Sequence, residues 1–469
     1  MKKKILLVWP SSARHNPPNW PPLGISYLAS YIAAFDSELQ IKLIDYDIEK
    51  FSAEIWQHEL SAYKPDIVGI SILMLNAANG MQLARMAKQE NPDIITVLGG
   101  GHASIFPHEC LQYSDIAVNG EGEKTFLEII QGMDLAAIKG ISYLRDGEFV
   151  DNPPRERISN LDELPFPSLG SFDMERYFGG GLSRGTNLSS ESVLRAGTVL
   201  GSRGCPYSCT FCASQQFWGR TIKFRSVKNI VDEIEFLLAK YQLNRINFQD
   251  DTINIPQSRA VEICDEIIKR GLNTKLQFYS LIRANKNFVS PELFQKMKAA
   301  NFVQVSLGIE SASPKVLKAM QKDLTPSEAR SAIKMARKAK IPSITGNFMV
   351  GNWDESFLDV LKTWYFAFTN NIEPLFWICT PYPGTEFSRR LMAAGYLDNG
   401  YSWLKDFKPG TYTSVSRTNK MSKISITIVY FDSVLFQLVL MLFRGKHRDE
   451  FLFFTKRALA ETREKLKRK

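Results

Sequence analysis

Cysteine and histidine are scarce in this chain of 469 residues, which contains six cysteines and five histidines. So few cysteines disfavour a disulfide framework, which stabilises small secreted domains rather than chains of this length. A structural zinc site is disfavoured as well, because such sites usually pair a Cys-x2-Cys element with a second pair of Cys or His ligands. Few, scattered cysteines are typical of a reducing compartment, so we expect a cytoplasmic protein.

Two further features are missing. The start of the chain, "MKKKILLVWPSS", has an apolar run too short for a signal peptide and instead predicts a buried first strand. No Gly-x-Gly-x-x-Gly follows that strand, which disfavours NAD or FAD.

The net charge of +9 does not lead us to expect nucleic acid, because much of the excess lies at 444–469. A solvated basic helix is the simplest explanation of that stretch, and a membrane-surface or anionic-substrate role is the alternative.

Three of the six cysteines fall within eight residues. Cys205, Cys209 and Cys212 form a Cys-x3-Cys-x2-Cys triplet, whereas the other three are isolated. Three thiolates are suited to ligate three irons of a cubane 4Fe-4S cluster. With no fourth cysteine nearby, the fourth iron would stay open to a substrate. The spacing differs from that of the common ferredoxins, so an ordinary electron carrier is not predicted.

The triplet, with Phe211 directly before its third cysteine, resembles the signature of radical S-adenosylmethionine (SAM) enzymes. The resemblance implies that the amino and carboxylate groups of SAM chelate the open iron. It also implies that one electron cleaves SAM to methionine and a 5′-deoxyadenosyl radical. An external electron donor such as flavodoxin or ferredoxin would then be a partner.

The chain is too long for one compact core and predicts several α/β units. Residues 1–140 alternate short apolar runs with helical stretches, which predicts a doubly wound, flavodoxin-like parallel sheet. Residues 141–195 are rich in Pro, Gly and Ser and predict a linker with a small hairpin, followed by a loop at 178–192 that crosses the active site. Residues 196–397 repeat strand then helix six times, which predicts a partial (β/α)6 TIM-like barrel. Residues 398–469 predict a helical region.

Ligands of both predicted folds bind at the carboxyl ends of the strands. The strands of the first unit are expected at 4–9, 41–46, 66–73, 94–100 and 116–120. Those of the barrel are expected at 197–204, 245–251, 275–282, 303–310, 343–350 and 373–381.

Glycine and polar residues gather at the strand ends of the first unit. The segments "PPLGISYLA", "PDIVGISI", "GGGHAS" and "GEGE", in this order before the triplet, resemble the cobalamin-binding domain of one branch of the radical SAM family. Glycines there would let a bulky flat ligand approach the backbone. His102 follows the glycine run and is either a cofactor contact or a capped loop residue. The resemblance implies a cobalamin site that includes Ser71, Leu73, Asn76, Gly99, Gly100, Gly101, His102, Gly120, Glu121, Gly122 and Glu123.

The chain departs from related families at two points. An Asp-x-His-x-x-Gly motif, which supplies a His to the lower face of cobalt, is absent, and residues 44–51 occupy roughly its place. A bound cobalt would then lack a His ligand from this motif. Methylthiotransferases carry a second cluster on three N-terminal cysteines, whereas this N-terminal unit contains only Cys110, so that class is excluded.

The resemblance also assigns SAM-binding residues to the barrel. A lone carboxylate after a strand is more often a helix cap, but polar residues follow all six predicted strands, which favours a site. Asp250 and Asp251 in "FQDD" would lie near the ribose and the methionine amine. Arg283 fits a partner for the methionine carboxylate, because a guanidinium engages it in a bidentate way. The remaining SAM residues are Phe211, Glu310 in "GIES", and Pro383 and Gly384 in "PYPGTEF". The segment "GNWDES" departs from a usual Gly-x-Pro-Gly-Glu-Thr.

The tail contains a long apolar stretch that Asp432, Ser433 and Gln437 interrupt, so it is a poor transmembrane span. A buried helix that closes the barrel mouth is the simpler interpretation. The alternative is an amphipathic surface helix that serves a lipid-like substrate and contacts the membrane peripherally.

These patterns predict a cobalamin-dependent radical SAM enzyme, and most simply a C-methyltransferase. An unactivated C–H bond cannot be deprotonated at neutral pH, so a carbon radical has to be made by hydrogen abstraction. The expected substrate is a bulky, apolar small molecule such as a lipid, tetrapyrrole or natural-product precursor. Two alternatives stay open: an oxidative cyclase with the same cofactors, which the chain also resembles, and a non-catalytic cobalamin or iron–sulfur sensor.

Overall fold

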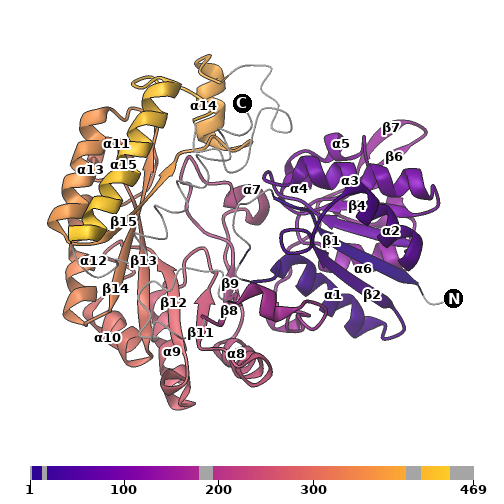
Figure 1. Ribbon diagram of the computed structural model, residues 1–469, viewed down its shortest axis with the longest axis horizontal. Coiled ribbons are helices and arrows are strands. Elements are labelled where there is room, and N and C mark those ends of the chain that lie inside the picture. The colour runs from indigo at the N-terminus through magenta and orange to yellow at the C-terminus, as the bar shows by residue number, and fades with distance from the viewer. Residues whose placement is uncertain (1–2, 13–17, 19, 179–193, 398–413, 444–469) are drawn as a thin grey trace.

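A computed structural model of the protein describes residues 3–12, 18, 20–178, 194–397 and 414–443. It shows two α/β units side by side, with the amino-terminal unit on the right in Figure 1 and the barrel on the left. The predicted loop at 178–192 falls outside the described residues, apart from Phe178.

The amino-terminal unit is a seven-stranded sheet with the order β2-β1-β3-β4-β5-β6-β7. The strands from β2 to β5 are parallel, which confirms the doubly wound sheet expected from the alternating pattern. The elements are β1 (Lys4–Trp9), α1 (Leu23–Phe35), β2 (Gln40–Asp45), α2 (Ala53–Tyr63), β3 (Ile67–Ser71), α3 (Ala77–Glu90), β4 (Ile95–Gly99), α4 (Gly101–Ile105), α5 (Pro107–Cys110), β5 (Ile116–Val118), α6 (Glu123–Ile130), β6 (Ile141–Arg145) and β7 (Glu148–Asp151).

Both faces of this sheet are covered by helices, as a parallel sheet requires. Ile5 and Leu7 of β1 point into a core formed with α1 and α6. The alternate residues Leu6 and Val8 point into a second core, which includes Trp56 of α2. Burial on both faces explains why the strand reads as a continuous apolar run.

The hairpin predicted in the linker is present, but it belongs to the sheet. Strand β6 pairs antiparallel with β5, and β7 pairs antiparallel with β6. The amino-terminal sheet therefore extends to Asp151, and the connection to the barrel starts after it.

The barrel unit has six parallel strands in the order β15-β14-β13-β12-β11-β8. Side-chain caps begin several of its helices: Ser226, Ser290 and Thr325 each accept a hydrogen bond from a backbone N–H of the first turn. The elements are β8 (Ala196–Val199), β9 (Ser202–Arg203), α7 (Ser214–Trp218), β10 (Lys223–Phe224), α8 (Val227–Tyr241), β11 (Arg245–Phe248), α9 (Gln257–Lys269), β12 (Gln277–Ile282), α10 (Pro291–Ala299), β13 (Phe302–Glu310), α11 (Pro314–Ala319), α12 (Pro326–Lys338), β14 (Ser343–Val350), α13 (Phe357–Thr369), β15 (Glu373–Ile378), α14 (Glu386–Ala393) and α15 (Lys423–Phe443).

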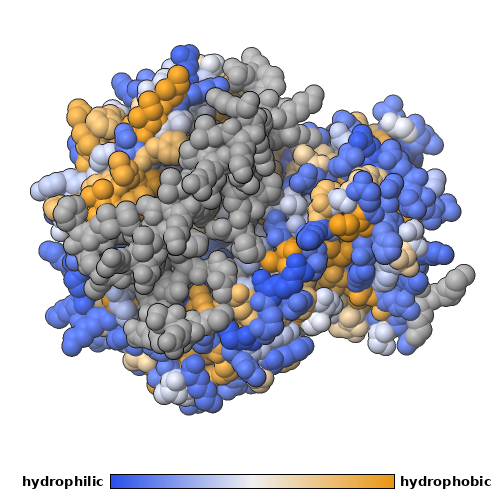
Figure 2. Space-filling model, in the orientation of Figure 1, coloured by the Kyte–Doolittle hydropathy of each residue, from blue (hydrophilic) through white to orange (hydrophobic). Residues whose placement is uncertain are grey.

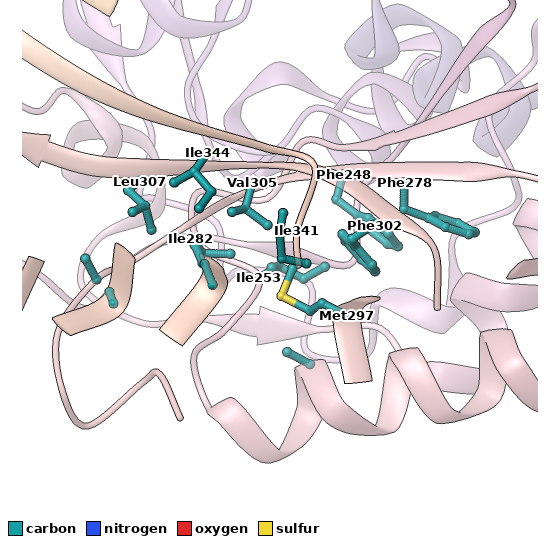
Figure 3. Packing of buried hydrophobic residues seen from close by; sticks show 14 of the residues in the cluster. Phe248, Ile253, Phe278, Ile282, Met297, Phe302, Val305, Leu307, Ile341 and Ile344 are labelled. Carbon is teal, nitrogen blue, oxygen red and sulfur yellow. The ribbon is translucent and has the colours of Figure 1, made fainter. Parts of the chain in front are cut away.

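The main core lies between the barrel strands and their helices (Figure 3). Phe248, Phe278 and Phe302 come from three neighbouring strands, and their ring centroids lie 5.5 to 6.2 Å apart. A second set of strand side chains forms a buried polar chain, in which Arg245 donates to Gln304 at 2.9 Å and Gln304 donates to Thr345 at 3.0 Å. Apolar packing thus fixes the strands, while the polar chain links β11, β13 and β14.

Helix α15 packs against β15, β14 and α13. Its buried residue Ile426 lies against Gly351, which directly follows β14 at the carboxyl end of the sheet. One face of the helix is therefore buried against the barrel, whereas the other face is exposed, so α15 is not the fully buried helix that the simpler interpretation of the tail expected. By length and composition, α15 is the one helix among the described residues that is apolar enough to cross a membrane.

Candidate active site

The three cysteines of the triplet lie on the loop between β9 and α7, at the carboxyl end of the first barrel strand. The backbone N–H of Cys212 donates to the carbonyl of Cys209 at 3.1 Å, which folds the loop into a turn. Thr210 fixes the loop on two sides: its N–H donates to Met320 at 2.9 Å, and its carbonyl accepts from Phe387 at 2.8 Å. We call this segment, which carries the three cysteines, the cluster loop. Neighbouring parts of the barrel hold it in place.

The chemistry of these thiols fits a cluster better than a single ion. Burial raises the pKa of Cys205 and raises that of Cys212 to about 11, so a bound cation is needed to hold either as thiolate at neutral pH. In the described part of the chain, no three His, Cys, Asp or Glu side chains converge to hold one metal ion. A cubane has no such requirement, because each thiolate ligates a different iron.

Asp250 and Asp251, the two predicted acids after β11, accept hydrogen bonds from different groups. Asp250 is buried, and it accepts hydrogen bonds from the Gly201 N–H at 2.9 Å and the Ser202 hydroxyl at 2.5 Å. It therefore fixes the turn that leads into the cluster loop. Asp251 accepts a bond from Ser214 Oγ at 2.8 Å at the start of α7, which places this carboxylate beside the cluster loop.

Arg283 lies against the cluster loop from the β12 side. Its guanidinium carbon is 3.3 Å from the ring centroid of Tyr207, which lies between Cys205 and Cys209. The same side chain donates to Asn285 at 2.8 Å and to the carbonyl of Lys322. Arg283 is thus brought to the predicted site with its orientation fixed by protein groups.

Glu310 ends β13 in a left-handed backbone conformation, with φ of 67°. Such a conformation is uncommon for a residue with a side chain, and it coincides with a register shift between β13 and β14. The carboxylate accepts a hydrogen bond from Lys322 Nζ at 2.8 Å, and both side chains are largely buried. Lys322 was not predicted from the sequence, because it lies in a short connection twelve residues further on.

The turn after β15 is attached to α7. Gln216 donates to the carbonyl of Gly384 at 2.7 Å, and a Cβ on Gly384 would lie 2.8 Å from the Gln216 amide oxygen. Pro383 is buried in the same turn. Phe211 instead packs on the apolar cluster that includes Phe387 of α14. Pro383 and Gly384 therefore lie near the cluster loop, whereas the Phe211 side chain packs this loop against the apolar cluster.

The unusual "GNWDES" loop adopts its turn without the Pro-Gly pair. Gly351 and Asp354 take positive φ values of 90° and 62°. The fully buried carboxylate of Glu355 then accepts bonds from the N–H groups of Gly351 at 2.7 Å and Asn352 at 3.1 Å. Burial raises the pKa of Glu355 to about 7.

A pocket of about 290 Å³ opens at the carboxyl ends of the strands of the amino-terminal sheet. Seven of the predicted cobalamin residues line it: Ser71, Gly99, Gly100, Gly120, Glu121, Gly122 and Glu123. A Cβ on Gly100 would lie 2.8 Å from the carbonyl oxygen of Ile72, so this turn accepts only glycine, whereas a Cβ on Gly120 or Gly122 would meet nothing within 4 Å. The wall is therefore bare backbone at these points, which fits a flat macrocycle.

The other four predicted cobalamin residues lie outside the pocket wall. His102 is fully buried between Met74, whose sulfur is 3.1 Å from Nδ1, and Glu109, whose carboxylate is 3.0 Å from Nε2. Asn76 accepts from the Leu73 N–H at 2.7 Å and closes the loop before α3. A Cβ on Gly101 would lie 2.5 Å from the Phe217 ring. His102 therefore lies in the first turn of α4, where Met74 and Glu109 hold its ring.

The segment that replaces the cobalt-ligating motif also lies outside the pocket. Asp45 accepts a hydrogen bond from Tyr177 at 2.8 Å, and Asp47 accepts from Trp9 at 3.0 Å and from the Ser12 N–H at 2.6 Å. These carboxylates hold neighbouring segments together, and neither lines the pocket.

Three residues of the barrel unit complete the pocket wall: Leu200, Arg203 and Trp218. Arg203 donates to Glu121 at 2.8 Å and to Glu123 at 2.7 Å, and all three side chains are at most 9% exposed. Trp218 ends α7, and the guanidinium of Arg203 lies 5.7 Å from its ring centroid, within cation–π range. The two glutamates were predicted to bind cofactor, but neither Arg203 nor Trp218 was predicted, because no local pattern marks a contact between units.

The comparisons with known proteins identify both units. Residues 199–363 match the radical SAM superfamily, and residues 14–130 match the B12 binding domain. The chain is 33% identical over 406 residues to an uncharacterized methyltransferase of Pyrococcus horikoshii, with 84% of each chain covered. It is 28% identical over 391 residues to an anaerobic magnesium-protoporphyrin IX monomethyl ester cyclase of Rubrivivax gelatinosus, covering 80% of this chain and 66% of the cyclase.

A solved structure shares the fold. The radical SAM methyltransferase TsrM from Kitasatospora setae, with cobalamin and a 4Fe-4S cluster bound, aligns with a TM-score of 0.69 at 18% identity, covering 84% of this chain and 75% of that one. The two matched domains imply a 4Fe-4S cluster, SAM and cobalamin as cofactors of this chain, and the predicted sites for them are the three thiols, the strand ends of the barrel and the glycine-walled pocket. The chain belongs to the radical SAM superfamily, in the branch that carries a B12-binding domain ahead of the barrel.

Proposed function

We propose that the chain is a cobalamin-dependent radical SAM C-methyltransferase that acts on a bulky, apolar small molecule. The observation that carries this proposal is the place of α7. The helix starts two residues after Cys212, and its last residue, Trp218, lines the pocket of the B12-binding domain. The predicted cluster site and the predicted cobalamin site therefore share one short helix, which suits two cofactors that act on the same substrate.

When bound, the cluster with SAM supplies a radical that abstracts a hydrogen atom, and cobalamin supplies a methyl group. The protein has to hold these groups in order and exclude water. Asp251 and Arg283 flank the cluster loop, and Lys322 fixes the carboxylate of Glu310. We infer that Asp251, Arg283 and Glu310 contact SAM and that Asp250 positions the loop.

Two of the relatives and the surface of the chain support the proposed substrate class. One relative is named as a magnesium-protoporphyrin IX monomethyl ester cyclase, and another is named as a hopanoid C-3 methylase. The present chain combines the same two domains with a strongly apolar barrel edge at α13 and α15. These observations support an apolar substrate, and the flavodoxin- or ferredoxin-like electron donor stays a prediction from the radical SAM resemblance.

Anaerobic reconstitution with and without hydroxocobalamin tests the proposal. The loaded enzyme should convert SAM to S-adenosylhomocysteine and 5′-deoxyadenosine when an accepted substrate is present. The same reaction without cobalamin should give 5′-deoxyadenosine alone. Loss of the cluster absorbance on replacing Cys205, Cys209 and Cys212 by Ala is the matching control, and Cys264→Ala, at a buried cysteine of α9, should leave it intact.

A radical cyclase is the second candidate, and the similarity to the Rubrivivax cyclase favours it. It would use the same cofactors but end in oxidation or ring closure. Formation of 5′-deoxyadenosine with no S-adenosylhomocysteine, in the presence of cobalamin and substrate, would reject methyl transfer and support the cyclase. A reconstituted protein that does not cleave SAM under a strong reductant would instead support a non-catalytic sensor.

A further inference from the structure

Helices α13 and α15 expose an unusual number of large apolar side chains. On α13 these lie at intervals of one to four residues along one side, and on α15 at intervals of three or four. We call this surface the outer apolar face, and it consists of Phe357, Leu358, Leu361, Tyr365 and Phe368 with Ile424, Ile428, Phe431, Leu435 and Val439. Figure 2 shows apolar side chains along α15 at the upper left of the molecule.

The opposite sides of both helices are already packed. Val360 and Phe366 of α13, with Ile426 and Val429 of α15, belong to the barrel core. Between the helices, the Trp364 ring stacks on Phe436 with centroids 5.2 Å apart, and its indole N–H donates to the Ser433 hydroxyl at 3.0 Å. The outer apolar face is thus a second surface of a well-packed helix pair.

This surface is too large to be an ordinary scatter of exposed apolar residues. Tyr365 is 69% exposed, Leu358 67%, Leu435 59% and Ile424 72%. The ten residues of the face make up nearly half of the large apolar side chains that are exposed in the described part of the chain. A contiguous patch of this kind on a soluble protein generally marks a contact site.

The chain that follows α15 indicates what the face contacts. Residues 444–469 contain ten Lys or Arg and four Asp or Glu, so this segment carries two thirds of the net charge of +9. It also includes the run Phe451–Phe454. Apolar side chains next to clustered basic residues are the combination that binds the headgroup region of an anionic bilayer.

We propose that the outer apolar face docks on the surface of an anionic lipid bilayer, with the basic segment 444–469 supplying electrostatic attraction. A second copy of the chain suits the face less well, because it would bring two basic segments together. The charged side chains exposed on the two helices, Lys362, Lys423 and Asp432, include no acidic cluster that would offset such repulsion.

Docking would place the membrane next to the active site. Ile426 at the start of α15 packs on Gly351 at the carboxyl end of β14, and Asn419 donates to Asp354 at the same rim. An apolar substrate dissolved in the bilayer would then reach the barrel mouth without crossing water. This consequence rests on the proposed function, whereas the docking itself does not.

Vesicle co-sedimentation of the anaerobically reconstituted full chain tests the proposal. The protein should bind vesicles of phosphatidylcholine with phosphatidylglycerol, bind pure phosphatidylcholine much more weakly, and be released by salt. The double variant Phe431→Glu with Leu435→Glu should weaken binding by about tenfold or more. Phe35→Glu is the matched control, because Phe35 is 61% exposed on α1, in the other unit.

Four results would overturn the proposal. The first is that the wild type does not bind the anionic vesicles, and the second is that the wild type and the double variant bind them equally. The third is stronger binding after removal of residues 444–469. The fourth is that the wild type is a dimer that binds no vesicles and that the double variant is a monomer. Removal of 444–469 should instead abolish the preference for phosphatidylglycerol. SAM cleavage in the absence of lipid should be unchanged in the double variant. A wild type that binds vesicles but does not cleave SAM would contradict the proposed function and leave the docking intact.

Discussion

Carboxylates at the strand ends of the barrel serve different purposes, although they look alike in the sequence. Asp250 and Glu355 accept bonds from backbone N–H groups and hold loops in shape. Glu310 pairs with a buried lysine, and Asp251 accepts from a serine at the start of α7. The choice between loop cap and ligand contact depends on partners that fold next to each residue, so the sequence alone does not decide it.

Glu355 should make the stability of the protein depend on pH. Burial raises its pKa from 4.5 to about 7, so the folded protein keeps a proton that the unfolded chain releases. The resulting stabilisation is fully present below pH about 4.5 and is lost as the pH rises to about 7. Glu355→Gln removes this dependence, so the variant should gain about 3 kcal/mol relative to wild type across that interval.

Thermal or urea unfolding at several pH values between about 5 and about 8 measures this difference. Glu148→Gln, on the exposed strand β7, is the control and should follow the wild type at every pH. If the difference in unfolding free energy between Glu355→Gln and wild type stays constant with pH, the raised pKa of Glu355 is contradicted.

At the scale of elements, the glycines of the B12-binding domain fall into two groups. Gly100, with φ of 86°, is required by the backbone, because any Cβ there would overlap the Ile72 carbonyl. Gly122 has an ordinary φ of −88° at the start of α6, lines the pocket, and has open space where a Cβ would lie. The first glycine is required by the backbone, and the second leaves open space in the pocket wall.

These two glycines therefore predict opposite results. Gly122→Leu should leave the thermal midpoint of the apoprotein nearly unchanged and weaken cobalamin binding by about tenfold or more, because the side chain fills the pocket. Gly100→Ala should destabilise the apoprotein by about 2 kcal/mol. Titration of hydroxocobalamin followed by corrin absorbance, together with apoprotein melting, checks both. Wild-type affinity in Gly122→Leu would show that the macrocycle does not approach this wall.

The elements themselves were largely predictable. Five parallel strands of the first unit and six of the barrel were expected from short apolar runs, and the structure confirms them, because a strand buried on both faces leaves a continuous apolar signature. The pairing between strands was harder to predict from the sequence. The hairpin at 141–151 joins the amino-terminal sheet through β5, and this long-range pairing leaves no mark in the composition of the linker.

The same limit applies to the site. Cys205, Cys209 and Cys212 are adjacent in sequence, so their spacing alone identifies them. Lys322 and Arg203 act through partners far along the chain, twelve and about eighty residues away, and no local pattern signals them. The cofactors were thus predictable from the sequence, while the structure shows which side chains hold the surrounding loops together.

At the scale of the whole molecule, the two units are joined by two buried ion pairs, Arg203–Glu121 and Arg203–Glu123, which we call the ion cluster. Arg203, two residues before the first cysteine, bridges Glu121 and Glu123 of the B12-binding domain. Arg157 of the connecting segment donates to the carbonyls of Arg203 and Trp218, both at 2.9 Å. The cluster loop, α7 and the cobalamin pocket are therefore held by one network, so a change in it should affect both units.

Arg203→Met should uncouple the two units. The change leaves two buried carboxylates without their partner, which costs about 3 to 5 kcal/mol. We expect the cooperative unfolding of the wild type to separate into two calorimetric transitions and cobalamin affinity to fall. Arg176→Met is the control: Arg176 pairs with Glu49 at an exposed site, where such a pair contributes at most about 1 kcal/mol.

A rescue experiment separates the loss of the ion cluster from a general packing defect. Adding Glu121→Gln and Glu123→Gln to Arg203→Met removes the unpaired charges while keeping similar volumes, so most of the lost stability should return. Return of stability without return of cobalamin affinity would mean that Arg203 also contacts the cofactor. If the triple variant stays as unstable as Arg203→Met, then shape rather than charge joins the two units, and the ion cluster is not the element that aligns the cofactors.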